Sequence, residues 1–138
     1  MKYFTAAIII LIFFVSACKK DEHKMPYVPV DIYIDVNSAI YNDINAVGGY
    51  MYLTGGYKGI IIYRAAYDQF VAIERACPYH PTTDCERLVV EPSGLTIADS
   101  TCGSRFLILD GSIVNGPSTK PALVYSTYYD GHYLHIYY

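Results

Sequence analysis

Three cysteines in the second half of the chain have residue types and spacing that could do chemistry. Cys77, Cys85 and Cys102 are accompanied by His80, which follows Cys77 in the pattern Cys-x-x-His. Three thiolates and one imidazole are a normal ligand set for tetrahedral zinc, and the Cys-x-x-His spacing suits it. In an oxidising compartment the same thiols are expected to pair as disulfides. These residues therefore predict either a metal site or a disulfide.

The segments around Cys102 have the frame of a metal-cluster loop with altered ligands. They read Asp99-Ser-Thr-Cys-Gly-Ser-Arg-Phe106 and Asp110-Gly-Ser-Ile-Val-Asn-Gly-Pro117. This frame resembles the second half of a Rieske iron-sulfur domain, in which a Cys-x-x-His pair runs into Gly-Ser-x-Phe or Gly-Ser-x-Tyr and a Gly-Pro loop covers the cluster. Aligned on Gly103-Ser104, the chain has Asp99 where the family has its Cys and Cys102 where the family has its His.

The resemblance continues upstream, in Ala76-Cys-Pro-Tyr-His-Pro81. Cys77 matches the Cys of the family's Cys-x-His motif, the family's His falls on Tyr79, and His80 lies one residue later. A Rieske [2Fe-2S] cluster uses two thiolates and two imidazoles. In strict register this chain keeps only the first thiolate, so the resemblance implies an ancestry in electron transfer and a changed site.

The resemblance also implies how the cysteines pair. The two ligand loops of a Rieske domain face each other across the cluster, so Cys77 and Cys102 would come close together without one. A disulfide requires Cα atoms within about 7 Å, which facing loops can reach. Some Rieske proteins carry a separate disulfide between the loops, which makes Cys85 with Cys102 the second candidate pair.

Two metal-bound alternatives remain open. One is zinc held by Cys77, His80, Cys85 and Cys102. The other is a [2Fe-2S] cluster in which Asp99 or His80 replaces a lost ligand. An oxidising cell surface that lacks cluster-assembly machinery favours the third option, a metal-free pair of loops joined through Cys102.

The loops contain supporting residues but no recognised catalytic pattern. In the resembling family the residue at Ser104 hydrogen-bonds a cluster sulfur, and Gly103, Gly116 and Pro117 belong to the loops that enclose the cluster. The chain has no Gly-x-Ser-x-Gly elbow, no His-Glu-x-x-His and no phosphate loop. We therefore expect no enzymatic activity.

The N-terminus resembles a bacterial lipoprotein signal. Lys2 precedes an apolar run over 6–15, and Val15-Ser-Ala-Cys18 closes the run as a lipobox does. A run this short is typical of a signal peptide rather than a membrane span. The resemblance implies that Cys18 carries diacylglycerol and an N-linked acyl chain such as palmitate; the alternative is an ordinary secretory signal. Lys19-Lys-Asp-Glu22 is similar to a signal that sends lipoproteins of Bacteroidetes-type bacteria to the outer cell surface.

These signals divide the chain into a signal peptide (1–17), a lipidated Cys with a flexible tether (18–29) and a β domain (30–138). Without Lys2, nine basic residues remain against thirteen acidic ones, a net charge of −4. A negative chain is a poor partner for nucleic acid. The expected partners are the membrane, through the lipid anchor, and a redox or surface protein of unknown identity. The expected location is the outer membrane, facing the periplasm or the exterior.

Hydrophobic periodicity predicts an all-β domain. Residues 31–36 and 133–137 alternate between polar and apolar side chains, as half-buried strands do. Further short β-branched or aromatic runs occur at 59–63, 70–73, 88–90, 95–97, 106–109 and 123–125. Turn pairs such as Asn115-Gly116, whose glycine is expected to have a positive φ, separate these runs. Many short strands separated by such turns predict an antiparallel sandwich or barrel. One helix candidate spans 36–47, although its Asn and β-branched residues are weak helix formers.

Overall fold

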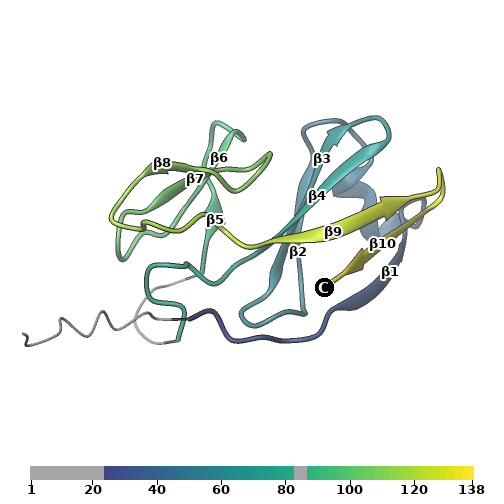
Figure 1. Ribbon diagram of the computed structural model, residues 1–138. Coiled ribbons are helices and arrows are strands. Elements are labelled where there is room, and N and C mark those ends of the chain that lie inside the picture. The colour runs from purple at the N-terminus through teal and green to yellow at the C-terminus, as the bar shows by residue number, and fades with distance from the viewer. Residues whose placement is uncertain (1–23, 83–86) are drawn as a thin grey trace, which may run out of the picture.

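The protein is built from two antiparallel β-sheets (Figure 1). A computed structural model describes residues 24–82 and 87–138. Within these residues the larger sheet has six strands in the order β1-β10-β9-β4-β3-β2, and the smaller sheet has four in the order β5-β6-β7-β8. The elements are β1 (Asp31–Asp35), the 3-10 helix η1 (Ala39–Ile44), β2 (Tyr50–Leu53), β3 (Ile60–Ala66), β4 (Gln69–Glu74), β5 (Val89–Val90), β6 (Thr96–Ala98), β7 (Arg105–Leu107), β8 (Ile113–Asn115), β9 (Val124–Tyr129) and β10 (Tyr133–Tyr137). The predicted all-β class is confirmed.

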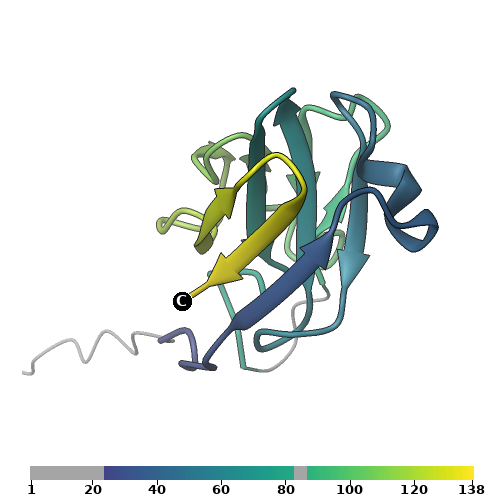
Figure 2. The same ribbon diagram turned by 90° about the vertical axis from the view of Figure 1, so that its right-hand side faces the viewer.

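The larger sheet curls around a first core. Figure 2 shows β1 and β10 crossing in front of β3 and β4. The alternation predicted for β1 and β10 is present, because Ile34 pairs with Leu134 and both side chains are buried inside the curl. Ile136 on β10 and Ile44 of η1 are fully buried in the same core. Each such side chain contributes about 1.5 to 3 kcal/mol of transfer free energy.

The strand β3 forms a wall shared by two cores. Ile60 and Ile62 pack into the first core, whereas Ile61 and Tyr63 pack into a second core beneath the smaller sheet. Phe106 of β7 lies in that second core and is fully buried. Because both faces of β3 are covered, its sequence is an unbroken apolar run instead of an alternating one.

The smaller sheet is an insertion between two neighbouring strands of the larger one. β4 and β9 are hydrogen-bonded neighbours, with Ala72 opposite Tyr125 and Ile73 opposite Val124. All four strands of the smaller sheet lie between β4 and β9 in the sequence. The chain therefore leaves the larger sheet just before Cys77 and returns just before β9, so the predicted site residues lie near this junction.

Three local predictions are wrong in detail. The helix candidate over 36–47 shortens to η1, because Ile44 is its one buried side chain and Ile40 is 78% exposed. The strand predicted over 106–109 ends at Leu107, before a turn in which Ser112 N donates to the Asp110 carboxylate. Gly116 lacks the positive φ predicted for it and forms a cis peptide bond with Pro117.

No helix in 24–82 or 87–138 is long and apolar enough to cross a membrane.

Candidate disulfide or metal site

The first loop of the site is anchored by a buried glutamate, Glu74, at the end of β4. One carboxylate oxygen accepts hydrogen bonds from Lys58 N at 2.8 Å and Ala76 N at 2.9 Å. The other accepts from Tyr57 N at 2.7 Å and from the Tyr125 hydroxyl at 2.5 Å. Burial, followed by the contact with Glu74, raises the pKa of Tyr125 well above the usual tyrosine range. These bonds fix the backbone immediately before Cys77.

The second loop is closed by Asp99, which follows β6. Its Oδ1 accepts hydrogen bonds from Thr101 N at 2.8 Å and Cys102 N at 3.2 Å. Backbone bonds from Gly103 N to the Asp99 carbonyl and from Asp99 N to the Ser104 carbonyl complete the turn. Gly103 has a φ of +79°, a conformation that side chains with a Cβ rarely adopt. The loop therefore has a defined shape that directs Cys102 toward Cys77.

A third segment, containing the Gly-Pro pair, is tied to the second loop. The Ser104 hydroxyl oxygen accepts a hydrogen bond from Ser118 N at 3.0 Å and lies 3.2 Å from the Cys102 sulfur. Asn115 Nδ2 donates to the Gly103 carbonyl at 3.3 Å. Ser104 therefore has the loop-supporting contact that the resemblance predicted for it, here to the sulfur of Cys102.

The two cysteines and the aspartate meet at the centre of these loops. The sulfurs of Cys77 and Cys102 are 3.6 Å apart. Together with Asp99 they form a group of three donor atoms that all lie within 4.8 Å of one another. Cys77 and Asp99 are fully buried, and Cys102 is half-buried. Asp99 Oδ2 is a buried acceptor with no hydrogen-bond partner among the described residues.

The surroundings of Cys77 favour its neutral thiol. Burial raises the pKa of Cys77 above the ordinary thiol range, and the nearby Cys102 and Asp99 raise it further. A backbone hydrogen bond involving Tyr79 acts in the opposite direction, without reversing the shift. A thiolate at Cys77 would therefore need a cation to compensate its charge.

The structure brings together only part of the predicted ligand set. Cys77, Cys102 and Asp99 converge, while Tyr79 and His80 pack edge to face on each other, with ring centroids 4.2 Å apart. His80 does not belong to the close donor group found among the described residues. Cys85, the other predicted ligand and disulfide candidate, and Cys18, the predicted lipid attachment site, lie outside the described residues.

The described donors do not fit a Rieske cluster. Such a cluster requires two thiolates and two imidazoles. Here a carboxylate joins two thiols, and the three donor atoms span no more than 4.8 Å. That spacing matches the first coordination sphere of a single ion. Among the described residues, this donor group suits a disulfide or a single metal ion.

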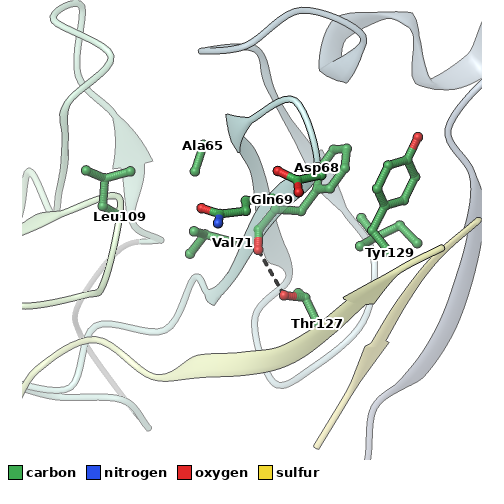
Figure 3. Close-up of a pocket in the computed structure, with 9 residues that line it drawn as sticks. Ala65, Asp68, Gln69, Val71, Leu109, Thr127 and Tyr129 are labelled. Atoms are coloured by element: carbon green, nitrogen blue, oxygen red, sulfur yellow. Dashed lines mark hydrogen bonds between the residues drawn. The ribbon is translucent and has the colours of Figure 1, made fainter. Parts of the chain in front are cut away.

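A separate cleft is lined mainly by the larger sheet and has a different character. Its volume is about 420 Å³, and Figure 3 shows Leu109 and Tyr129 toward its two ends with Gln69 and Val71 between them. Thr127 Oγ1 donates to the Phe70 carbonyl at its wall. Its remaining lining residues are Ala65, Asp68 and Leu134. None of the described residues that line this cleft is a cysteine or a histidine.

Two comparisons with known proteins identify no relative. No protein-family model matches the chain, and no curated protein matches it.

Proposed function

We propose that the chain is a lipid-anchored, non-catalytic Rieske-like module of the outer membrane, facing the periplasm or the exterior. In this proposal a disulfide between Cys77 and Cys102 joins the two loops where a Rieske domain would hold its cluster. The observation that carries the proposal is the 3.6 Å separation of the two sulfurs. The module would act as a binding or structural element for a surface protein partner.

The local geometry supports a disulfide between Cys77 and Cys102. A disulfide needs an S–S distance of about 2.05 Å, so the sulfurs of Cys77 and Cys102 must approach by only about 1.5 Å. Both cysteines lie on loops whose backbones are held by buried carboxylates. An extracytoplasmic location would supply the oxidising conditions under which such a pair closes.

Peptide mapping of the full chain, purified in air without reductant, tests the disulfide. We expect one linked fragment that contains Cys77 and Cys102, and we expect it to persist in Cys85→Ser. The substitution Cys102→Ser should abolish it. Recovery of a Cys85–Cys102 linkage, or of Cys77 and Cys102 as free thiols after purification in air, would contradict the proposed pairing.

Metabolic labelling tests the anchor. Labelled palmitate should enter the wild-type chain and should be absent from Cys18→Ala, because the acyl chains are carried by that residue in lipoproteins. The wild type should partition into the membrane fraction and the variant should not. Protease added to intact cells then separates the two orientations, since only a chain on the exterior is digested before the outer membrane is opened. A freely soluble, unlabelled wild-type chain would rule out the lipoprotein assignment.

A zinc centre is the second candidate function, and it is favoured by the position of the Asp99 carboxylate beside the two cysteine sulfurs. The sequence suggested zinc with His80 and Cys85, whereas the converging donor is the Asp99 carboxylate. The remaining alternative, electron transfer through a modified [2Fe-2S] cluster, would need donors beyond these three.

A further inference from the structure

We propose that Cys77, Asp99 and Cys102, in the dithiol state of the protein, bind one zinc ion that leaves a fourth coordination position open. This inference shares its two sulfurs with the disulfide proposed above, and it adds a ligand, Asp99, and a second state of the same site. Zinc with two thiolates and one carboxylate has the ligand types common in proteins. Three protein ligands and an open position are typical of an accessible metal centre.

The distances suit one ion. Two sulfurs that are each about 2.3 Å from a zinc ion, with a tetrahedral angle between them, are about 3.8 Å apart. The sulfurs of Cys77 and Cys102 are 3.6 Å apart. The carboxylate of Asp99 lies within 4.8 Å of both. An ion could therefore enter with small side-chain movements and without displacement of either loop.

The unsatisfied carboxylate oxygen supplies an independent argument. Asp99 is fully buried, and its two nearest backbone donors both bind Oδ1. Oδ2 has no partner among the described residues. A buried carboxylate oxygen without a hydrogen bond costs free energy, which a metal ion at this position would recover.

Each ligand sulfur has a hydrogen-bonding group beside it. The Ser104 oxygen already accepts from Ser118 N, so its own proton is free to rotate toward the Cys102 sulfur once that sulfur is ionised. On the other side, a backbone hydrogen bond involving Tyr79 stabilises the ionised form of Cys77. Donors to ligand sulfurs and fixed ligand carboxylates are the outer contacts that metal sites use.

The ligand types also select the metal. Two thiolates disfavour magnesium and calcium, which prefer oxygen donors, and they favour zinc and its spectroscopic substitute cobalt. Cys102 is half-buried, which gives the ion a route from solvent. Binding replaces the two thiol protons by one zinc ion and releases both protons to solvent.

Metal and disulfide exclude each other at this site. With oxidised glutathione as the oxidant, the zinc-bound dithiolate, one glutathione disulfide and two protons give the protein disulfide, two glutathione thiols and one free zinc ion. Cys77 and Cys102 lose two electrons and the glutathione disulfide gains them. Oxidation would therefore release zinc.

Cobalt titration of the full chain tests the inference. The chain is purified in detergent with reductant, freed of metal by a chelator, and titrated with Co²⁺ followed by competing Zn²⁺. We expect one equivalent of Co²⁺ to produce sulfur-to-cobalt charge-transfer absorption and the intense visible bands of a tetrahedral site. One equivalent of Zn²⁺ should remove them, and oxidised glutathione should release the zinc.

The matched variants are Asp99→Asn and Asp130→Asn. Both residues accept two backbone N–H bonds through Oδ1, but Asp130 lies in the exposed turn between β9 and β10. We expect Asp99→Asn to weaken zinc binding by at least about tenfold, and Asp130→Asn to leave it unchanged. The cobalt absorption should also persist in Cys85→Ser.

Three results would overturn the inference. They are the absence of charge-transfer absorption in the reduced wild type, equal zinc affinity of Asp99→Asn and Asp130→Asn, and loss of the absorption in Cys85→Ser. Failure of the proposed disulfide is a separate outcome, read from peptide mapping of the air-purified chain. A chain that binds zinc when reduced but forms no Cys77–Cys102 linkage in air would refute the disulfide and support the metal site.

Discussion

Glu74→Gln should lower the free energy of unfolding by about 3 to 5 kcal/mol. The carboxylate accepts four hydrogen bonds in a fully buried position. Each carboxylate oxygen accepts two of these bonds, and in Gln one of the two oxygens becomes an NH₂ group, which cannot accept. At least two donors then lose their acceptor, and each buried polar group left unsatisfied costs about 1 to 3 kcal/mol. Denaturant unfolding of the full chain, followed by fluorescence of its tyrosines, measures the change.

Glu91→Gln is the matched control for this prediction. Glu91 pairs with Arg105 at 3.0 Å and accepts a hydrogen bond from the Thr96 hydroxyl; the Arg105 side chain is 52% exposed and that of Glu91 is 24% exposed. Exposed ion pairs contribute about 0 to 1 kcal/mol, so this variant should unfold almost as the wild type does. Equal unfolding midpoints for the two variants would show that Glu74 does not anchor the loop.

Glu74→Gln should also speed the reaction of Cys77 with thiol reagents in the reduced protein, because Ala76 N loses its partner.

Reduction of the proposed Cys77–Cys102 disulfide should cost about 3.5 kcal/mol of stability. The two residues are 25 positions apart in the sequence. Closing a loop of this length removes conformational entropy from the unfolded chain by about that amount. For a domain of this size the melting temperature should fall by roughly 10 to 20 °C. Calorimetry with and without reductant measures the difference.

Cysteine variants separate this effect from a general effect of reductant. Cys102→Ser should melt near the temperature of the reduced wild type and should not respond to reductant. Cys85→Ser should keep both the higher melting temperature and the response. A wild type whose melting temperature is unchanged by reductant would argue against a stabilising disulfide.

The same disulfide should control how stability depends on alkaline pH. In the reduced protein the folded-state pKa of Cys77 lies above the ordinary thiol value of 9.0. The stabilisation from the neutral thiol is therefore complete below that value and is lost as pH rises above it. The oxidised protein has no ionisable thiol at this position, so its advantage over the reduced protein should widen as the pH is raised from neutral to about 10.

The strands are predicted best from the sequence where at least one face is buried. The alternating apolar residues of β1 and β10 indicate a core on one side, and the unbroken apolar run of β3 indicates cores on both sides. By contrast β8 is exposed at every residue, so its sequence has no periodic signal. β2 is a short edge strand with half-exposed residues, and it was missed for a similar reason.

The site was predicted in part, for reasons that lie in its tertiary contacts. The approach of Cys77 to Cys102 follows from the resemblance between the loops and the Rieske frame, and the distance supports it. Local spacing suggested His80 as a ligand, and His80 lies outside the close donor group found among the described residues. The role of Glu74 was missed, because its donors come from residues distant in sequence. A single acidic residue that ends an apolar strand directly before a cysteine loop was the available signal.

The insertion of the smaller sheet between β4 and β9 has a consequence for sequence divergence. The segment between β4 and β9 is an insertion in the larger sheet, and its two ends are joined by the hydrogen bond from Glu74 N to the Leu123 carbonyl. Doubling the length of a flexible loop costs only about 0.6 kcal/mol in closure entropy. The exposed turns of this segment can therefore change in length at little entropic cost, whereas its buried residues, such as Phe106, stay constrained by the second core. The residues of β3 that face both cores have no such freedom, because any change in their volume disturbs packing on two sides at once.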